Sequence, residues 1–357
     1  MKNLIIFIPS IEKGGVEKNL FIRSNYLIKK LVNVYIVTAN NDFNQRFHNK
    51  IKIICPKNKF WNNKSRLLKT LYCFFLTLSY FKKKNCVLLS FQANLFSIII
   101  SKILKFRIIL RLNTSPTKYI NSYVKKILFK KIYKLADKII VNSKQFKKLL
   151  KNELNIKSKF IYNPISDKFK AKRNINQLNQ KLKILNIGRL TDQKDQLTLL
   201  KALNLLKEND IKFSAKIIGS GYKFNRLENY IKKNNLQKKV KLLGYKKNAY
   251  KFMNKANIFV LSSKYEGLPN VLIEAQQCNL PIISSNCPSG PSEILINGKL
   301  GDLYPVGDYK KLYIKIKDFF DDKKELIIKS NLAKKYLIRF DVKKNCNKYY
   351  KTIIKFL

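Results

Sequence analysis

The stretch EGLPNVLIE, which runs from Glu266 to Glu274, places two carboxylates around a turn from a strand to a helix. Five apolar or small residues, 258–262, precede it as a buried strand would. We expect the helix to begin near Pro269, because proline favours the first helical position. Glu266 then lies in the loop at the carboxyl end of the strand, and Glu274 lies in the second turn of the helix. Both carboxylates can face one crevice outside the strand ends, where open α/β sheets bind nucleotides.

Short apolar runs alternate with helical stretches along the whole chain. Runs that are apolar throughout, rather than alternating, are typical of strands buried on both faces of a parallel sheet. In the first half they span 3–8, 32–39, 51–56, 86–91, 107–113, 138–143 and 160–164. In the second half they span 183–188, 215–219, 240–244, 258–263, 281–286 and 302–306. The pattern predicts an α/β protein with two doubly wound domains.

Length also favours two domains, because 357 residues exceed what one hydrophobic core usually holds. We expect the first domain at residues 1–165 and the second at 182–339. The polar segment 166–181 lacks apolar periodicity and would link them. Residues 340–357 follow as a helix.

The chain is strongly basic, with 74 Lys or Arg against 21 Asp or Glu and a formal charge of +53. Such a charge suits nucleic acid, an anionic membrane or phosphate-rich substrates. Lys and Asn are spread along the whole chain, so we attribute most of the charge to codon usage in an AT-rich genome, with attraction to membranes as a consequence. Nucleic-acid readers usually combine a basic stripe with a recognisable module or stacking aromatics, and the sequence has neither. We therefore expect no nucleic-acid partner.

Cysteine and histidine usage restrict the chemistry. The six cysteines form no C-x-x-C pair and have no metal-ligand spacing, which predicts a reduced, cytosolic protein. His48 is the only histidine, so mechanisms that need two histidines are excluded. The apolar start at 3–8 is too short for a secretory signal. The longest apolar tracts, 67–81 and 87–104, contain Lys69 and Lys102 and are short for a membrane span.

Two further turns have residues that are typical of phosphate-binding turns. Gly14 and Gly15 follow the first strand and precede a helix; a plain turn would use the same glycines, but this position favours close approach of a phosphate to the backbone and helix amino terminus. In GRLTDQK, Gly188 and Arg189 follow a strand and Lys194 ends the turn. Both basic side chains can converge on a diphosphate, arginine through bidentate hydrogen bonds and lysine as a point charge.

Together these segments resemble glycosyltransferase family 4, whose members are retaining enzymes with the two-domain GT-B fold. Glu266 and Glu274 match the E-x7-E motif of the family. Its other parts follow in the expected order, as IPSIEKGGVEKNL near the start, NIGRLTDQKDQLTLLKAL at 186–203, IIGSGY at 217–222 and NCPSGPSEIL at 286–295. A motif gains weight from such context. The subset that builds sugars on polyprenyl diphosphate shares the CPSGPSEIL signature.

The resemblance implies roles for these residues. Arg189 and Lys194 would neutralise the leaving nucleoside diphosphate, Glu266 would hold a hydroxyl of the donor sugar, and Glu274 would bind the ribose. The catalytic set is thus Glu266, Arg189 and Lys194. Further donor contacts would come from Gly14, Gly15, Gly188, Gly219, Gly221, Tyr245, Gly267 and Leu268. The chain has no D-x-D motif, so we expect no metal and no cofactor besides the nucleotide-sugar substrate.

The segment RLNTSP departs from the many family members that carry a histidine there. The polyprenyl-diphosphate subset has an Arg-Asn segment instead. We therefore expect Arg111, Asn113 and Gly290 to contact the acceptor or the donor sugar.

The basic amphipathic stretch 120–136 is the candidate for membrane contact. Its apolar residues, Ile120, Val124, Ile127, Leu128 and Leu135, share helical spacing, with Lys125, Lys126, Lys130, Lys131 and Lys134 largely on the other side. A helix packed on the core gives the same pattern, because binding to anionic lipid requires both apolar burial and charge.

The sequence thus predicts a retaining, metal-independent hexosyltransferase. It would move a hexose or N-acetylhexosamine from a UDP-linked sugar to a polyprenyl-diphosphate-linked or surface-glycan acceptor, in polysaccharide or lipopolysaccharide biosynthesis. By resemblance, the first domain would bind the acceptor, the second would bind the nucleotide sugar, and residues 340–357 would cross back to the first. We expect a peripheral protein on the inner face of the cytoplasmic membrane. A GT-B sugar-nucleotide epimerase or hydrolase is the alternative, and it would consume the donor without an acceptor.

Overall fold

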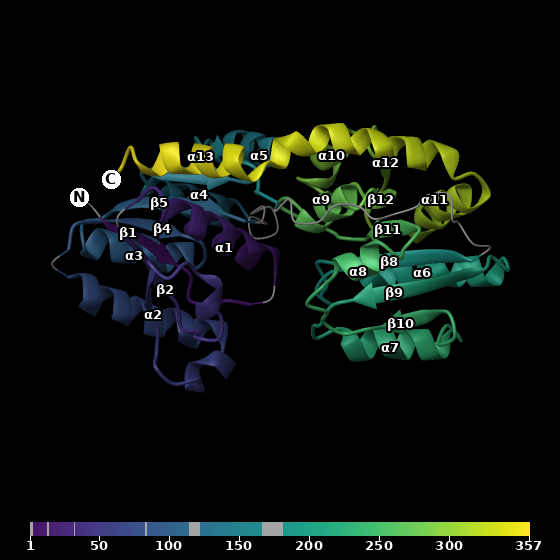
Figure 1. The fold of residues 1–357 in the computed structure, drawn as a ribbon, viewed down its shortest axis with the longest axis horizontal. Coiled ribbons are helices and arrows are strands. Elements are labelled where there is room, and N and C mark those ends of the chain that lie inside the picture. Colours follow the sequence, from purple (N-terminus) through teal and green to yellow (C-terminus); the bar gives the residue numbers. More distant parts are fainter. Residues whose placement is uncertain (1–2, 13, 32, 83, 114–121, 166–180) are drawn as a thin grey trace. The chain divides into compact units, whose positions relative to one another are not determined.

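The computed structural model describes residues 3–12, 14–31, 33–82, 84–113, 122–165 and 181–357. The chain divides into two compact units, shown in Figure 1. Unit 1 comprises Met1–Ser166 and Phe340–Leu357, and unit 2 comprises Asp167–Arg339. Of the segment 166–181 that the sequence assigns to a linker, all but Lys181 lies outside the described residues.

Unit 1 is built on a parallel sheet of seven strands in the order β3-β2-β1-β4-β5-β6-β7. The strands are β1 (Asn3–Phe7), β2 (Val34–Val37), β3 (Lys52–Ile54), β4 (Cys86–Ser90), β5 (Arg107–Leu112), β6 (Lys138–Val141) and β7 (Lys159–Phe160). In the middle of the sheet, Ile6 lies opposite Ile36 on one side and Leu89 on the other. Strands β1 and β4 are buried along almost their whole length, which explains why they appear in the sequence as unbroken apolar runs.

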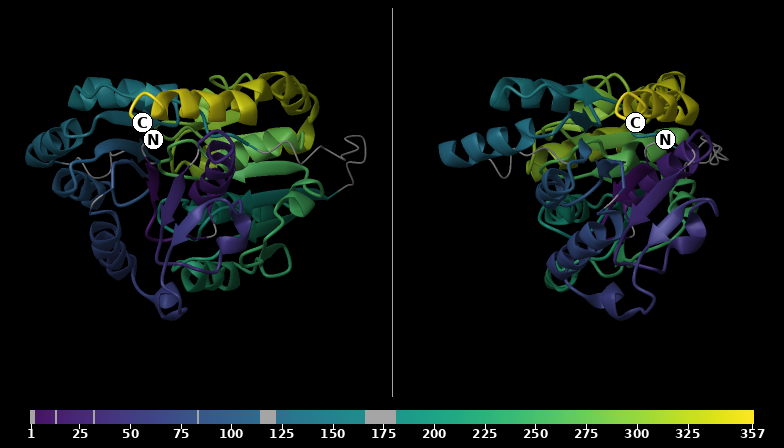
Figure 2. Two further views of the ribbon diagram at one scale, coloured as in Figure 1. Left: turned by 60° about the vertical axis from the view of Figure 1, so that its left-hand side comes forward. Right: turned by 90° about the vertical axis from the view of Figure 1, so that its left-hand side faces the viewer.

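Helices cover both faces of this sheet, as the views in Figure 2 show. They are α1 (Gly15–Leu27), α2 (Arg66–Phe81), α3 (Asn94–Ile103), α4 (Tyr123–Lys134), α5 (Lys144–Leu154) and α13 (Val342–Ile353), with short 3-10 turns η1 (Asn44–Arg46) and η2 (Phe60–Asn63). Helices α2 to α5 pack on one face and α1 with α13 on the other. Serine side chains cap the amino termini of α2, α4 and α5, each accepting from a backbone N–H.

Unit 2 repeats the architecture with six parallel strands in the order β10-β9-β8-β11-β12-β13. The strands are β8 (Leu182–Ile187), β9 (Phe213–Ile218), β10 (Val240–Leu242), β11 (Ile258–Leu261), β12 (Ile282–Ser285) and β13 (Asp302–Tyr304). The helices are α6 (Gln196–Glu208), α7 (Phe224–Lys233), α8 (Tyr250–Met253), α9 (Asn270–Gln277), α10 (Pro291–Ile294), α11 (Tyr309–Asp321) and α12 (Lys324–Tyr336), followed by η4 (Leu337–Phe340). Leu199 of α6, Leu227 of α7 and Ile316 of α11 share one core with the sheet.

The α/β class and the two parallel sheets are confirmed, and each predicted apolar run overlaps a strand, although the run 160–164 shares only Phe160 with β7. The apolar tract 87–104 is divided, because β4 ends at Ser90 and α3 begins at Asn94. Pro269 is the N-cap of α9 instead of its first helical residue, and Glu274 lies in the second turn. None of the helices in the described part of the chain has the length and apolar content that a bilayer crossing needs.

Candidate active site

The strand order of unit 2 reverses between β8 and β11, which pair directly with each other. At such a reversal the connections leave toward opposite faces, so a crevice opens beyond the carboxyl ends of the two strands. The turn after β8 carries Gly188, Arg189 and Lys194, and the turn after β11 carries Glu266. The topology therefore brings together two motifs that are more than seventy residues apart in the sequence.

Lys194 and Glu266 form an ion pair between Nζ and Oε1, with side chains only 16% and 7% exposed. The same carboxylate oxygen accepts a hydrogen bond of 2.6 Å from Ser263 Oγ. Ser289 Oγ donates to the backbone oxygen of Glu266 at 2.9 Å, which fixes the turn itself. A buried charge is costly unless it is paired and hydrogen-bonded, and here both conditions are met. The site holds a cation and an anion in fixed positions.

The turn that carries Lys194 is anchored to the turn after β11 by three further bonds. Ser262 Oγ donates to the Lys194 carbonyl oxygen at 2.9 Å. Gln193 Nε2 donates to the Tyr265 oxygen at 2.9 Å, and the Lys264 N–H donates to the Gln193 oxygen at 2.8 Å. The position of Lys194 is thus set by backbone contacts as well as by its ion pair. Gly188 lies under the Lys194 stem, since a Cβ there would lie 3.4 Å from Lys194 Cδ.

Gly219 and Gly290 are required by close backbone approach. Gly219 has φ +151°, and a Cβ would lie 1.8 Å from the Gly188 oxygen. Gly290 has φ +110°, and its Cβ would lie 2.6 Å from the Gly267 oxygen. The turns after β9 and β12 therefore pack directly against the turns after β8 and β11. Gly221 likewise lies against Leu190.

Glu274 is 5% exposed and lies near Tyr250 of α8. Burial raises the pKa of Tyr250, and the nearby Glu274 carboxylate raises it further, so the phenol stays protonated. Tyr245, predicted near the base, is 43% exposed in the segment after β10. Leu268 follows Gly267 in the turn that leads into α9, and it is buried. The roles of these residues toward a donor stay predictions.

The thiol of Cys287 lies close enough to the Lys194–Glu266 pair for the charge of Glu266 to change its pKa. Burial and then the Glu266 carboxylate raise the pKa of Cys287 to about 12. The thiol is therefore protonated at neutral pH and does not serve as a nucleophile. Across the described ranges, no group of three or more His, Cys, Asp or Glu side chains is placed to hold a metal ion.

The candidates in unit 1 lie in a different environment. Gly14 caps α1 and Gly15 begins it, and a Cβ on Gly14 would lie 2.8 Å from Glu17 Oε2. Arg111 is 2% exposed, donates from Nη2 to Asn163 Oδ1 at 3.0 Å and has its guanidinium over the Phe91 ring. Burial, and next the charge of Arg23, lower the pKa of Arg111.

Asn113 donates to the Phe91 carbonyl oxygen at 2.8 Å. Like Arg111, it makes contacts inside unit 1. Whether Arg111 and Asn113 also reach an acceptor or a sugar stays a prediction.

Reasoning from the sequence did not predict that Ser263, Ser289 and Tyr250 belong to the site. The only signal was position: Ser262 and Ser263 follow an apolar strand, and Ser289 precedes Gly290 in NCPSGP. Single hydroxyls at strand ends are too common to be singled out without the contacts that they make.

Residues 167–335 match the family described as Glycosyl transferases group 1. The chain is 39% identical over 180 residues to an uncharacterized glycosyltransferase of Methanocaldococcus jannaschii, a match that covers 47% of this chain and 44% of the relative. It is 29% identical over 361 residues to a Campylobacter jejuni protein named N-acetylgalactosamine-N,N'-diacetylbacillosaminyl-diphospho-undecaprenol 4-alpha-N-acetylgalactosaminyltransferase, with 96% of both chains covered.

Among solved structures, Anabaena HepE in complex with UDP and glucose has the same fold, with a TM-score of 0.82 at 17% identity, over 99% of this chain and 100% of that one. The similarity in fold extends over both units, and the family match falls on the unit that holds the Lys194–Glu266 pair. The chain has the GT-B fold, and its residues 167–335 match the group 1 glycosyl transferases.

Proposed function

We propose that this chain is a retaining, metal-independent hexosyltransferase that moves a hexose or N-acetylhexosamine from a UDP sugar to a polyprenyl-diphosphate-linked acceptor. The observation that carries the proposal is the buried Lys194–Glu266 pair at the reversal of strand order. The acceptor class is supported by the Campylobacter jejuni relative, whose name specifies a diphospho-undecaprenol substrate.

Lys194 supplies a fixed positive charge where the leaving diphosphate develops negative charge, and Arg189 supplies a second from the same turn. A cation that is already in position costs no reorganisation during the reaction, so it stabilises the transition state more than a mobile one. Glu266 orients Lys194 in the absence of donor. With donor bound, its carboxylate accepts a hydrogen bond from a hydroxyl of the sugar.

Retention follows if the acceptor hydroxyl attacks the anomeric carbon from the face that the diphosphate leaves. The bond from that carbon to the phosphate oxygen breaks, the bond to the acceptor oxygen forms, and the leaving phosphate oxygen takes the acceptor proton. No covalent ester on Glu266 or Glu274 is needed. Glu274 binds the ribose and contributes to donor affinity.

A lipid-linked acceptor places the reaction at a membrane surface, which we propose is the inner face of the cytoplasmic membrane. The basic helix α4 fits this location, because Val124 and Leu128 are exposed between its lysines. Phe129, Ile132 and Tyr133 are the residues of α4 that pack on the core.

The test is incubation of the purified protein with labelled UDP sugars and polyprenyl-diphosphate acceptors. We expect one sugar to be transferred, the product to keep the donor's anomeric configuration by NMR, and EDTA to leave the rate largely unchanged. An inverted product, or loss with EDTA and rescue by manganese, would contradict the mechanism. Consumption of the donor at the same rate without acceptor would favour an epimerase or hydrolase.

A further inference from the structure

Helices α2 and α3 of unit 1 turn an unusual set of side chains outward. On α2, Leu67, Leu71 and Phe75 recur every four residues, and Leu67 and Phe75 are 62% and 65% exposed. On α3, Leu95, Ile99 and Ile103 have the same spacing, and Ile103 is 56% exposed. We call these six residues the α2–α3 face. Surface helices of water-soluble proteins normally direct such a stripe toward the core.

The side of each helix that packs on the sheet is more polar than this face. In α2 its buried residues are Lys69, Thr70, Cys73, Thr77 and Phe81. Thr77 Oγ1 donates to the Cys73 oxygen at 2.6 Å, so its hydroxyl is satisfied within the helix. In α3 two of the four buried residues are isoleucines and two are Ser97 and Ser101, which also donate hydrogen bonds inside unit 1. The two helices thus partly invert the usual arrangement, in which the apolar side of a surface helix faces the core. This favours an apolar environment outside the protein over both helices.

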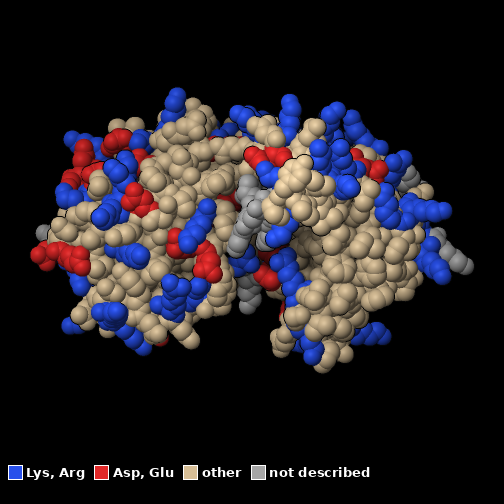
Figure 3. All heavy atoms as spheres, turned by 180° about the vertical axis from the view of Figure 1, so that it is seen from behind, with Lys and Arg blue, Asp and Glu red and all other residues tan. Residues whose placement is uncertain are grey.

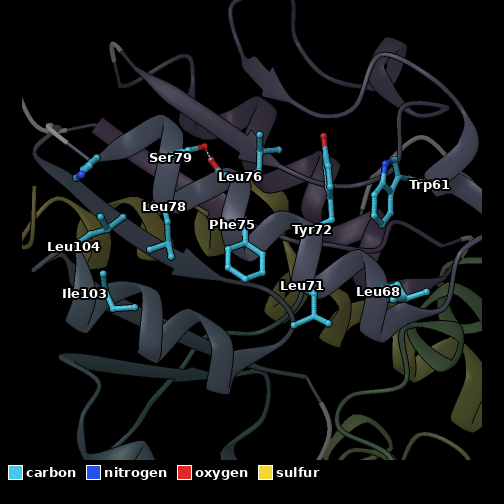
Figure 4. Close-up of a pocket in the computed structure, with 11 residues that line it drawn as sticks. Trp61, Leu68, Leu71, Tyr72, Phe75, Leu76, Leu78, Ser79, Ile103 and Leu104 are labelled. Carbon is cyan, nitrogen blue, oxygen red and sulfur yellow. Dashed lines mark hydrogen bonds between the residues drawn. The ribbon is translucent and has the colours of Figure 1, made fainter.

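The two helices form a groove of about 770 Å³ that is lined chiefly by apolar side chains (Figure 4). Leu68, Leu71 and Phe75 of α2 line it together with Ile103 of α3. Trp61 lies at one end, half-buried, with its ring 4.3 Å from that of Tyr72. Aromatic rings with one polar edge are favoured where an apolar layer meets water. Exposed apolar patches that are rimmed by polar residues mark sites of interaction with membranes or proteins.

Charge decides between these partners. Residues 43–136, which include both helices and α4, contain 21 Lys or Arg and no Asp or Glu. Lys64 and Arg66 precede or begin α2, Lys82 follows it, and Lys102 and Lys105 lie at the end of α3. On the side of Figure 3 that holds unit 1, a broad area without charged residues is bordered by Lys and Arg. Two copies of such a face would repel each other, whereas anionic headgroups would neutralise the rim.

Helix α4 extends the basic rim next to α3. Tyr133 of α4 shares a hydrogen bond with Asn94 at the start of α3. The exposed residues of α4 alternate between apolar ones, such as Val124 at 73% exposure, and lysines. The two helices and α4 all cover the same face of the unit 1 sheet.

We infer that the α2–α3 face inserts into the interfacial layer of an anionic bilayer, with α4 and the flanking lysines on the headgroups. Apolar burial supplies affinity and the basic rim supplies attraction to anionic lipid, the combination that interfacial helices use. The inference deepens the proposed function, because it locates the surface that would bring unit 1 to a lipid-linked acceptor. Binding to vesicles needs neither donor nor acceptor, so the vesicle experiments can contradict this inference without contradicting the proposed function.

Trp61 is the only tryptophan, so its fluorescence reports on the groove in the unmodified protein. We would titrate the full chain with vesicles of equal parts phosphatidylglycerol and phosphatidylcholine, free of polyprenyl lipid. The inference expects a blue shift of the emission and quenching by acyl chains brominated near the headgroup. Bound protein whose Trp61 emission neither shifts nor is quenched would overturn it.

The second test replaces Leu67, Leu71 and Phe75 together with Gln. All three are exposed, so the substitution should leave the melting temperature unchanged. The matched control replaces Ile328, Leu332 and Ile338 of unit 2, which are also exposed. We expect vesicle partitioning to fall at least about tenfold in the first variant, since each inserted side chain contributes affinity, and to stay unchanged in the control.

A third variant, with Gln at Lys125, Lys130 and Lys134, separates charge from insertion. Its vesicle binding should weaken at low salt and converge on that of the wild type at high salt, because exposed charges are screened.

Three results would overturn the inference. The first is that the Leu67, Leu71 and Phe75 variant binds vesicles as well as the wild type does, and the second is that the wild type binds only vesicles doped with polyprenyl phosphate. The third is that light scattering finds a dimer for the wild type and a monomer for the same variant. The second would assign the groove to an isoprenoid chain and the third to a subunit interface. A short-chain soluble acceptor distinguishes the two proposals. The variant should glycosylate it at the wild-type rate, whereas failure of the wild type to do so would count against the proposed function alone.

Discussion

The turns beyond the central strands of units 1 and 2 occupy equivalent places in two similar sheets, but they are joined differently. In unit 2 the turns after β8 and β11 are joined by the Lys194–Glu266 ion pair. In unit 1 the turns after β1 and β4 are joined through the neutral Gln92, which accepts from the Ser10 N–H at 3.3 Å and donates to Glu17 at 3.5 Å. The same topology thus carries a fixed cation in one unit and an amide in the other.

Two arginines of unit 1 are buried more deeply than Lys194. Arg23 and Arg111 are 1% and 2% exposed, whereas the Lys194 side chain is 16% exposed. Arg23 lies over the Tyr349 ring of α13 and donates to the Tyr162 oxygen, so it holds the C-terminal helix in unit 1. We therefore propose that the diphosphate binds in unit 2, where the charged side chain of Lys194 is more accessible than those of Arg23 and Arg111.

Replacing Lys194 with Ala should have the largest effect. The leaving diphosphate loses a preorganised cation, which costs about 3 kcal/mol in the transition state, or roughly a hundredfold in rate. Steady-state turnover at saturating donor measures this. Near-normal turnover would show that the accessible cation of unit 2 has no part in catalysis.

That variant also leaves the buried Glu266 carboxylate unpaired, which costs stability on its own. Lys194→Met combined with Glu266→Gln removes both charges and serves as the control. We expect the combined variant to recover most of the lost melting temperature without recovering turnover. Recovery of both together would mean that the pair is only structural.

Glu266→Gln should mainly lower the maximal rate, by about tenfold to a hundredfold. The carboxylate lies beside the reacting sugar in our account, and contacts that strengthen in the transition state appear in kcat. Gln keeps an oxygen that can accept from Ser263, so the turn should hold. A change confined to the donor KM would move Glu266 from the reacting sugar to simple binding. Trapping a glycosyl ester on Glu266 would refute the mechanism.

Gly219→Ala tests how tightly the turns of unit 2 are packed. Its Cβ would meet the Gly188 oxygen at 1.8 Å, and we expect a loss of about 3 kcal/mol in unfolding free energy, from strain and from displacement of the Arg189 turn. Gly307→Ala is the matched control, since it also has positive φ but nothing within 4 Å. Chemical denaturation measures both. Equal losses would show that backbone conformation, and not the close approach, makes Gly219 necessary.

Glu274→Gln should have the smallest of these effects. In our proposal Glu274 contacts the ribose in both ground and transition states, so the change should raise the donor KM by about tenfold and leave kcat nearly unchanged. The buried position beside Tyr250 accepts an amide of the same size. A fall in kcat equal to that of Glu266→Gln would remove the distinction between the two glutamates.

Much of the fold could be predicted because strands buried on both faces leave unbroken apolar runs, and each run from 3–8 to 302–306 overlaps a strand. The order GRLTDQK then EGLPNVLIE indicated which turns carry the chemistry. The ion pair between Lys194 and Glu266 could not be foreseen, because it depends on the pairing of β8 with β11.

The surface was harder to predict than the core. The sequence assigned membrane contact to 120–136 and treated the apolar tract 67–81 only as a failed transmembrane span. The apolar side chains along one face of a helix can point toward the core or away from it. In α2 only the burial of Cys73 and Thr77 shows that Leu71 and Phe75 face outward.

Calorimetric titration with UDP tests the assignment of the diphosphate to unit 2 most directly, using the wild type, Lys194→Ala and the exposed control Lys238→Ala. Loss of one fixed cation at the diphosphate should weaken UDP binding by about tenfold or more in Lys194→Ala, and Lys238→Ala should bind as the wild type does. Chemical shift perturbation on UDP addition should fall on Gly188, Gly219 and Gly267 of unit 2. Unchanged UDP affinity in Lys194→Ala, with perturbations centred on Gly14 and Gly15 of unit 1, would contradict the account.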